Sequence, residues 1–258
     1  MTDDVLLVQR LGATALLTLH RPEKLNALSH AVEGALDAAI ASEEVRGAAC
    51  VVIVGAGRAF SAGADVTEFP DQDPGAIMAY YEERGNVFER ITRLPQPTIA
   101  AIHGYCLGGG FELALACDFR VADATAVFGL PEVDIAILPS SGGTVQLVRL
   151  VGPGRAKELI LLRDRFGAEE ALRYGVVNEV VAGSGALPRA MEMAERFAGL
   201  PPIAVRAAKA ATDAAAGAPR EAALLIERYG YAMLAQTADA DEAARAFIEK
   251  REPRFQGR

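Results

Sequence analysis

Short clusters of apolar residues alternate with longer stretches of helical spacing along most of the chain. Clusters at residues 5–8, 15–19 and 50–54 predict strands, because each is short, rich in Val, Leu or Ile, and separated from the next by Gly or Pro. The first two strands are expected to pair as a hairpin. Residues 29–41 predict a helix with Ser29 as its N-cap, since large apolar residues recur there at every fourth position. These elements form a strand, strand, helix unit.

The same alternation continues through the middle of the chain. Residues 77–92 predict a helix, residues 98–103 a strand, and residues 117–121 a further strand. Between these two strands, another helix is expected to begin in the glycine run at residues 108–110. Repeated alternation of strands and helices predicts the α/β class.

The last part of the chain has a different pattern. From about residue 187 onward the apolar spacing is helical, and no strand is predicted. Four helices are expected, over residues 190–198, 203–214, 222–235 and 241–250. We therefore predict two parts, a core at residues 1–196 and a helical region at residues 197–258.

Composition changes this picture little. With 258 residues, of which 51% are hydrophobic and 23% charged, the chain is long enough to bury a sizeable core. Its formal net charge of −8 argues against an extended basic surface for a phosphate backbone, so no nucleic-acid partner is expected. A small polyanionic ligand is compatible with this net charge, because a few cationic side chains and helix N-termini are enough to bind one.

Cysteine usage and the N-terminus bear on the compartment. The three cysteines, Cys50, Cys106 and Cys117, are widely spaced in apolar runs, which predicts reduced core residues. The first ten residues are acidic and lack the pattern of a secretory signal. No apolar run reaches the ~18 residues that a membrane span requires. The expected location is the cytoplasm, without membrane attachment.

The sequence GYCLGGGFELALA at residues 104–116 places three glycines between a predicted strand and an apolar helix. Glycines let backbone N–H groups approach a ligand closely, and the positive end of a helix favours an oxyanion. Glu112 lies in the first turn of this helix. The alternative is a tight turn with close packing, in which Glu112 is an ordinary helix-start carboxylate.

The sequence GRAFSAGADVTE at residues 57–68 follows a predicted strand and offers further small residues with free backbone amides, so it could supply a second donor. The alternative is a plain loop from strand to helix, capped by Asp65 or Thr67. A dinucleotide fingerprint is rejected, because Phe60 occupies the position of its third glycine.

Glu132, in the sequence FGLPEVD at residues 128–134, follows a proline among apolar residues. Desolvation there would raise the pKa of its carboxyl group and let it exchange protons near neutral pH, whereas the alternative is a surface acid. Asp134 is interpreted as structural. The sequence predicts no metal site, no Ser- or His-based triad and no phosphate-binding loop, because the spacings that these sites require are missing.

Taken together and in this order, these segments resemble the crotonase family, the enoyl-CoA hydratase/isomerase superfamily. The resemblance covers essentially the whole chain. Its motifs are HRPEKLNAL at residues 20–28, AGAD at 62–65, the glycine run with Glu112 at 104–112, GLPE at 129–132, GGT at 142–144 and FIEKR at 247–251. It implies a spiral of repeated ββα units, followed by a helical C-terminal region that forms trimers, commonly as dimers of trimers.

The resemblance also implies a reaction. The amides of Ala64 and Gly109 map onto the family's oxyanion hole, which would bind the carbonyl oxygen of an acyl-CoA thioester and stabilise its enolate. Glutamates stand at both acid positions, as in the hydratases of the family. Glu112 would orient and deprotonate water, and Glu132 would protonate the α-carbon, giving syn addition to a 2-enoyl-CoA. Coenzyme A is part of this substrate, and no separate cofactor is expected.

Two classes of alternative remain open. Other reactions of the same enolate, such as isomerisation, decarboxylation or thioester hydrolysis, can use the same fold. The second class is a non-catalytic CoA-binding subunit or an RNA-binding member of the family. The net charge argues against RNA, and the presence of both glutamates argues against an inert scaffold.

The resemblance assigns further substrate contacts. The residues expected to bind substrate are Lys24, Leu25, Ala27, Ala62, Ala64, Asp65, Val66, Gly109, Leu130, Ser140, Phe247 and Lys250. Phe247 and Lys250 would reach the CoA bound by a neighbouring subunit, with ordinary helix surface as the alternative. Leu130 and the segment at residues 68–83 would contact the acyl chain.

Two positions depart from the family pattern. Ser140 stands where many hydratases carry a glycine whose amide helps to hold the catalytic water; serine keeps that amide and adds a hydroxyl group. Ala136 also stands where a glycine is frequent, which would either narrow the acyl pocket or change only the packing.

Overall fold

The computed structural model describes residues 4–258 except 69–72, 74, 76–77, 80–81 and 83–85. Its larger sheet has six strands in the order β1-β2-β3-β5-β7-β10. Their bounds are Leu6–Leu11, Thr14–Leu19, Cys50–Gly55, Thr98–Ile102, Phe119–Asp123 and Glu179–Val181. β1 and β2 are antiparallel, which confirms the predicted hairpin, and the strands from β2 to β10 run parallel to their neighbours.

A smaller sheet contributes the second strand of each repeated strand–strand–helix unit after the first. Its strands are β4 (Ala59–Ser61), β6 (Tyr105–Leu107), β8 (Val127–Gly129) and β9 (Phe166–Gly167), in that order. Strands β3, β5 and β7 of the large sheet are each followed in the chain by a strand of the small sheet. These two- and three-residue strands were not predicted from the sequence, because they are too short to show a period of two. The repeated ββα units confirm the expected α/β fold.

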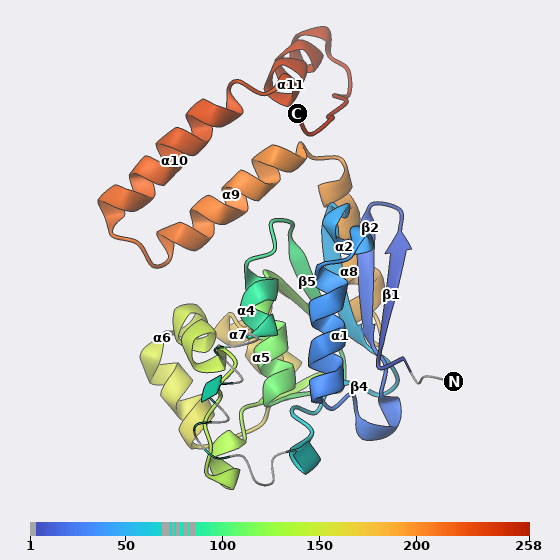
Figure 1. Cartoon of the computed structure of the whole chain (residues 1–258), viewed down its shortest axis with the longest axis vertical. Coiled ribbons are helices and arrows are strands. Elements are labelled where there is room, and N and C mark those ends of the chain that lie inside the picture. The colour runs from blue at the N-terminus through green and yellow to red at the C-terminus, as the bar shows by residue number, and fades with distance from the viewer. Residues whose placement is uncertain (1–3, 69–72, 74, 76–77, 80–81, 83–85) are drawn as a thin grey trace.

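Helices cover both faces of the large sheet (Figure 1). On one face, α1 (His30–Ile40), α4 (Val87–Thr92) and α5 (Gly109–Ala116) enclose the main core, together with α2 (Glu43–Arg46). On the other face, α8 (Ala186–Ala198) packs alanines against a second apolar cluster of strand residues. Strand β3 is buried along its whole length because both of its faces are covered.

Two further helices flank β9 in the chain, α6 (Gly143–Leu161) before it and α7 (Ala168–Tyr174) after it. The helix expected at residues 77–92 is observed as α4 over its last six residues. Much of its earlier part lies outside the described residues. The N-cap predicted for α1 is confirmed, because the Ser29 hydroxyl oxygen accepts a hydrogen bond from the Val32 amide at 3.3 Å.

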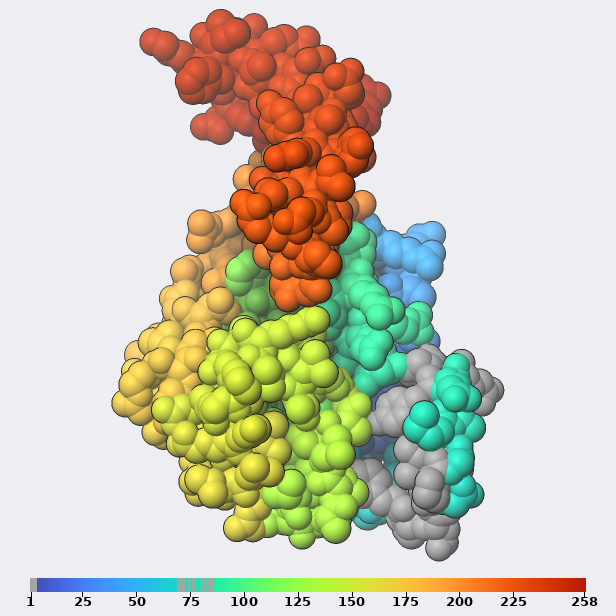
Figure 2. Space-filling view, turned by 90° about the vertical axis from the view of Figure 1, so that its left-hand side faces the viewer, coloured from blue at the N-terminus to red at the C-terminus, as the bar shows by residue number. Residues whose placement is uncertain are grey.

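The last three helices, α9 (Pro202–Ala215), α10 (Arg220–Leu234) and α11 (Ala238–Glu249), form an arm that extends away from the sheets (Figures 1 and 2). Neither α9 nor α10 buries any residue, and α10 exposes several large apolar side chains. The helices predicted for this region are observed. The division at residue 196 remains a prediction, and it falls within the last turn of α8. No helix among the described residues has both the length and the apolar content to cross a membrane.

Replacing Ser29 with Ala should lower the free energy of unfolding by about 1 kcal/mol, because the Val32 amide loses its acceptor at the start of α1. Ser29→Gly should cost only a few tenths of a kcal/mol, since glycine tolerates the cap conformation and admits water. Chemical denaturation of the two variants tests this order. Equal losses would show that the hydroxyl group does not cap the helix.

Candidate active site

Helix α5 begins at a backbone turn that glycine favours. Gly108 has φ 50° and ψ −128°, a conformation that residues with a side chain rarely adopt, and Gly109 is the first helical residue. A Cβ added to Gly109 would lie 3.5 Å from the amide nitrogen of Ala64, and one added to Gly63 would lie 3.5 Å from the amide nitrogen of Gly109. The amides of Ala64 and Gly109 are therefore neighbours. Within the described residues, neither donates a hydrogen bond to the protein.

The loop that carries Ala64 is held by residues 24–28, which include the predicted substrate contacts Lys24, Leu25 and Ala27. The amide of Ala62 donates to the carbonyl oxygen of Leu25 at 2.9 Å, and the amide of Leu28 donates to that of Gly63 at 2.8 Å. The amide of Asp65 then donates to the carbonyl oxygen of Leu28 at 2.8 Å. Residues 24–28 and 62–65, far apart in the sequence, thus lie side by side.

The turn at residues 21–27 is fixed by a buried asparagine. Leu25 and Asn26 both have positive φ values, 51° and 54°, which turn the chain back on itself. The side-chain amide of Asn26 donates to the carbonyl oxygens of Ala56 and Ala59, at 2.8 Å each. The backbone around Ala27 is therefore held in place from the end of β3 and the start of β4.

Asp65 is occupied by protein groups rather than open to a ligand. Its carboxylate accepts hydrogen bonds from the Thr67 hydroxyl group at 2.7 Å and from Arg21 at 3.0 Å, and it pairs with Lys24 at 3.5 Å. The bonds from Thr67 and Arg21 hold the pKa of Asp65 well below its usual range. The side chain secures the loop after Ala64. The neighbouring Val66 is 60% exposed and its side chain is accessible to a ligand.

Glu112 lies in the first turn of α5 and is almost completely buried. Its Oε1 atom accepts hydrogen bonds from the backbone amides of Ser141, at 2.8 Å, and Gly143, at 2.9 Å. Burial raises the pKa of its carboxyl group, and the two amides act against that shift. These anchoring amides were not predicted. The glycine pair Gly142–Gly143 at the start of α6 was the one sequence feature that pointed to them. A side chain at Gly143 would collide with Glu112, because its Cβ would lie 2.7 Å from Glu112 Cγ.

Glu132 is the first residue of a short 3-10 helix, Glu132–Ile135, and is only 9% exposed. Neither of its carboxyl oxygens has a hydrogen-bond partner among the described residues. Burial raises the pKa of Glu132 to about 7, and the charge of Glu112 acts in the same direction. A Cβ at Gly108 would lie 3.2 Å from Glu132 Oε1, so this carboxyl group borders the glycine that begins α5.

The structure therefore brings together four of the predicted catalytic groups from three segments: Ala64, Gly109, Glu112 and Glu132. Two unpaired N–H groups lie at the positive end of a helix, where an oxyanion is stabilised. Beside them are one carboxyl group held by backbone amides and one without protein partners, whose pKa lies near neutral pH. Two carboxyl groups in such different environments can take different roles, one accepting a proton and the other donating one.

Other predicted substrate contacts lie at varying distances from this centre. Ser140 is exposed and precedes the Ser141 amide that binds Glu112, whereas Leu130 is buried in the main core. Phe247, 86% exposed, and Lys250 lie at the end of α11, at the opposite end of the molecule from β4 (Figure 1). Within one chain, these two residues do not approach the four predicted catalytic groups. The expected acyl-chain contacts Pro70, Pro74, Tyr80 and Tyr81 lie outside the described residues.

Ala136 is exposed and ends the 3-10 helix that carries Glu132. Its φ of 60° and ψ of 28° lie in the left-handed region, which disfavours any residue with a Cβ. Glycine suits this position because of the backbone conformation. The narrower acyl pocket and the changed packing both stay predictions.

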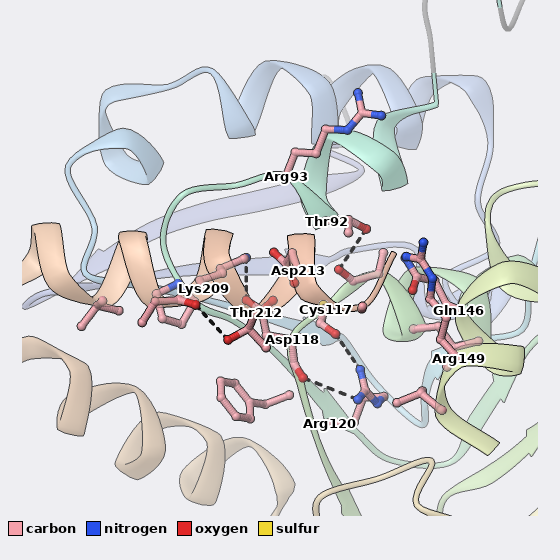
Figure 3. Close-up of a pocket in the computed structure, with 18 of the residues that line it drawn as sticks. Thr92, Arg93, Cys117, Asp118, Arg120, Gln146, Arg149, Lys209, Thr212 and Asp213 are labelled. Carbon is pink, nitrogen blue, oxygen red and sulfur yellow. Dashed lines mark hydrogen bonds and ion pairs between the residues drawn. The ribbon is translucent and has the colours of Figure 1, made fainter. Parts of the chain in front are cut away.

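A large cavity lies elsewhere. It is open to solvent, has a volume of about 720 Å³, and is lined by the C-terminal ends of α4 and α5 and by residues of α6, α8 and the arm helix α9 (Figure 3). Asp118, Arg120 and Lys209 lie on its wall, but none of the four predicted catalytic groups does. The candidate site thus rests on its chemistry and not on cavity size. Within the described part of the chain, no group of three or more His, Cys, Asp or Glu side chains is placed to hold a metal ion.

Comparison with known proteins supports the sequence resemblance. A family model described as enoyl-CoA hydratase/isomerase matches residues 10–258. The chain is 38% identical to a short-chain-enoyl-CoA hydratase of Clostridium acetobutylicum, over 95% of each chain. It is also 38% identical to the 2,3-dehydroadipyl-CoA hydratase of Escherichia coli, over 98% of this chain and 99% of that protein.

Solved structures agree with the sequence comparison. A crystal structure of an enoyl-CoA hydratase from Bacillus anthracis is 38% identical and superimposes with a TM-score of 0.92. The match covers 98% of this chain and all of the other, 100%. Core and arm therefore both have counterparts in that structure.

Ala136→Gly should raise the free energy of unfolding by about 1 kcal/mol, because it removes the cost of a Cβ in the left-handed conformation. Urea denaturation of the wild type and the variant measures this difference. An unchanged or lower stability would show that the alanine side chain makes compensating contacts.

The stability of the protein should depend on the ionisation of Glu132. The pKa of this group is raised in the folded state from 4.5 to about 7, so the folded state binds the proton more tightly, and ionisation destabilises the fold as pH rises through this window. Glu132→Gln removes the penalty. The difference in free energy of unfolding between the variant and wild type should be more favourable to the variant at pH 8 than at pH 4.5, by on the order of 2 kcal/mol. Urea denaturation at the two pH values measures it. The same difference at both pH values would contradict a raised pKa.

Proposed function

The chain belongs to the enoyl-CoA hydratase/isomerase family, and we propose that it hydrates 2-enoyl-CoA thioesters to 3-hydroxyacyl-CoA by syn addition of water. One observation carries this proposal. Two buried carboxyl groups, those of Glu112 and Glu132, adjoin the neighbouring unpaired amides of Ala64 and Gly109. Water addition needs such a pair, because one group must accept a proton and the other must donate one.

The amides of Ala64 and Gly109 would bind the thioester carbonyl oxygen. Polarisation of this carbonyl group draws electrons from the conjugated double bond and makes the β-carbon electrophilic. As water adds, negative charge accumulates on the oxygen, at the positive end of α5. Removing one donor of such a pair typically costs ~10²–10³ in rate, which makes this interaction a principal contribution to catalysis.

The two glutamates would divide the proton transfers. Glu112, held by the Ser141 and Gly143 amides, orients the water and takes a proton from it as the oxygen bonds to the β-carbon. Glu132, with its pKa of about 7, is available in its protonated form near neutral pH and delivers a proton to the α-carbon. Water between the two carboxyl groups adds to one face of the double bond, which accounts for syn addition. Proton exchange then restores the starting state.

Substrate binding is proposed to involve a second chain. The backbone around Lys24, Leu25 and Ala27 would hold the CoA, beside the loop of Ala64. Phe247 and Lys250 would contact the CoA of a neighbouring subunit in a homotrimer or a dimer of trimers. Their exposure and their distance from the site of their own chain favour this arrangement. The protein is proposed to act in the cytoplasm on an acyl-CoA, without a separate cofactor.

Isomerisation is the nearest competing reaction, since the family includes isomerases and a double-bond shift uses the same enolate. It needs no water and can proceed with a single acid. The burial of both glutamates against the same glycine-rich helix start favours hydration. The identity of the product decides between the two reactions.

Loss of conjugated-thioester absorbance on adding the protein to crotonyl-CoA and longer 2-enoyl-CoAs tests hydration. Wild-type protein should form 3-hydroxyacyl-CoA, and Glu112→Gln and Glu132→Gln should each reduce kcat by ~10²–10⁴, because each removes one proton-transfer group. Glu89→Gln, an exposed carboxylate on α4, serves as the matched control and should retain full activity.

Two results would count against this proposal. Conversion of a 3-enoyl-CoA into the 2-enoyl isomer without formation of 3-hydroxyacyl-CoA would establish isomerisation instead. Binding of CoA esters without turnover at any chain length would establish a non-catalytic subunit.

A further inference from the structure

A buried arginine closes the end of the helix that carries the proposed catalytic groups. Arg120, on β7, is only 4% exposed. Its Nη1 atom donates to the carbonyl oxygen of Cys117 at 2.6 Å and to that of Ala114 at 3.4 Å, at the C-terminal end of α5. Its Nε atom donates to the carbonyl oxygen of Val176 at 2.6 Å. Figure 3 shows the guanidinium group directed at this turn.

This arrangement explains how a buried cation is tolerated. The last carbonyl groups of a helix lack intrahelical partners and carry partial negative charge, so a guanidinium group is well placed there. The nearby carboxylate of Asp118 is engaged by other groups, accepting bonds from the Thr98 amide at 2.8 Å and from Lys209 at 2.6 Å. Arg120 is therefore bound to backbone oxygens of α5 and of the segment after α7.

The opposite end of α5 carries the Gly109 amide and Glu112. The helix has 8 residues, so it is about 12 Å long. Its N-cap residue, Gly108, provides no side-chain cap. Arg120 also ties α5 to a neighbouring segment, because the Val176 carbonyl oxygen belongs to the connection between α7 and β10. The backbone contacts of Arg120 thus hold the C-terminal end of the helix whose first residue is Gly109.

We propose that Arg120 is a positioning residue for the oxyanion hole: it holds the C-terminal end of α5 so that the Gly109 amide stays aligned with the Ala64 amide. This inference rests on the proposed function. Arg120 touches neither substrate nor reacting atoms, and it acts through the helix. A displacement of about 1 Å at the Gly109 amide is enough to cost ~10² in rate.

The test compares kcat, KM and the infrared carbonyl stretch of bound butyryl-CoA, a saturated thioester that cannot be hydrated. In wild-type protein this stretch should move to lower frequency on binding, because two amides polarise the carbonyl group. Arg120→Met should lose much of this shift and about 10²-fold in kcat. KM should change little, since the proposed CoA contacts at residues 24–27 lie on another segment.

Arg189→Met is the matched control, because it removes an arginine that binds Glu179 through two contacts, at 2.8 and 3.0 Å, away from α5. It should leave both the carbonyl shift and kcat unchanged. Arg120→Lys is the second variant, used also where Arg120→Met does not fold. It keeps the charge but not the planar fork that reaches Val176 and Cys117 together, and it should lose part of the shift.

The outcomes separate this inference from the function on which it rests. Folded Arg120→Met or Arg120→Lys protein with a wild-type carbonyl shift and kcat would overturn the positioning role alone. Wild-type protein that binds butyryl-CoA without any carbonyl shift would overturn the proposed oxyanion hole, and the positioning role with it. A shift reduced in both Arg120 variants but not in Arg189→Met would establish the positioning role.

Discussion

The start of α5 lies so close to β4 and the following loop that there is no room for side chains at the contact. A Cβ on Gly110 would lie 2.6 Å from the Cβ of Ser61, and one on Gly63 would lie 3.0 Å from the carbonyl oxygen of Leu107. This close backbone approach places the amides of Ala64 and Gly109 side by side. Glu112 stands one turn further along the same helix, and Glu132 borders the glycine that begins it. The geometry of the whole site therefore follows from one contact between glycine-rich segments.

The two glutamates show how surroundings differentiate identical side chains. Both are buried, and burial raises the pKa of each. Glu112 keeps two backbone amides as donors, which favour its charged form, whereas Glu132 has no partner among the described residues and is held near neutrality at a pKa of about 7. This difference in hydrogen bonding supports the proposed assignment of base to Glu112 and acid to Glu132, which the family resemblance implied.

The C-terminal arm, formed by α9, α10 and α11, packs little against the rest of the chain. No residue of its helices α9 and α10 is fully buried within the chain, and α10 exposes apolar residues that include Leu225, Ile226 and Tyr229. A connection to the core is nevertheless specific, because Lys209 on α9 binds Asp118 beside the end of α5. The arm is thus fixed at its base, and its apolar surface is available to the neighbouring subunits of the proposed trimer.

Hydrophobic period is a local signal, and it predicted strands β1, β2, β3, β5 and β7, helices α1, α5 and α8 to α11, and the N-cap at Ser29. It did not predict α2, α6, α7 or β10. The sequence also proposed the residues of the candidate site. Much of that site prediction came from a family resemblance, not from spacing. The small sheet was missed because two- and three-residue strands have no measurable period. The amides that hold Glu112 come from residues 29 and 31 positions further along the chain. The tie between Arg120 and Val176 spans 56 positions. Only tertiary structure decides such contacts, because they depend on where distant backbone groups meet, which no local pattern encodes.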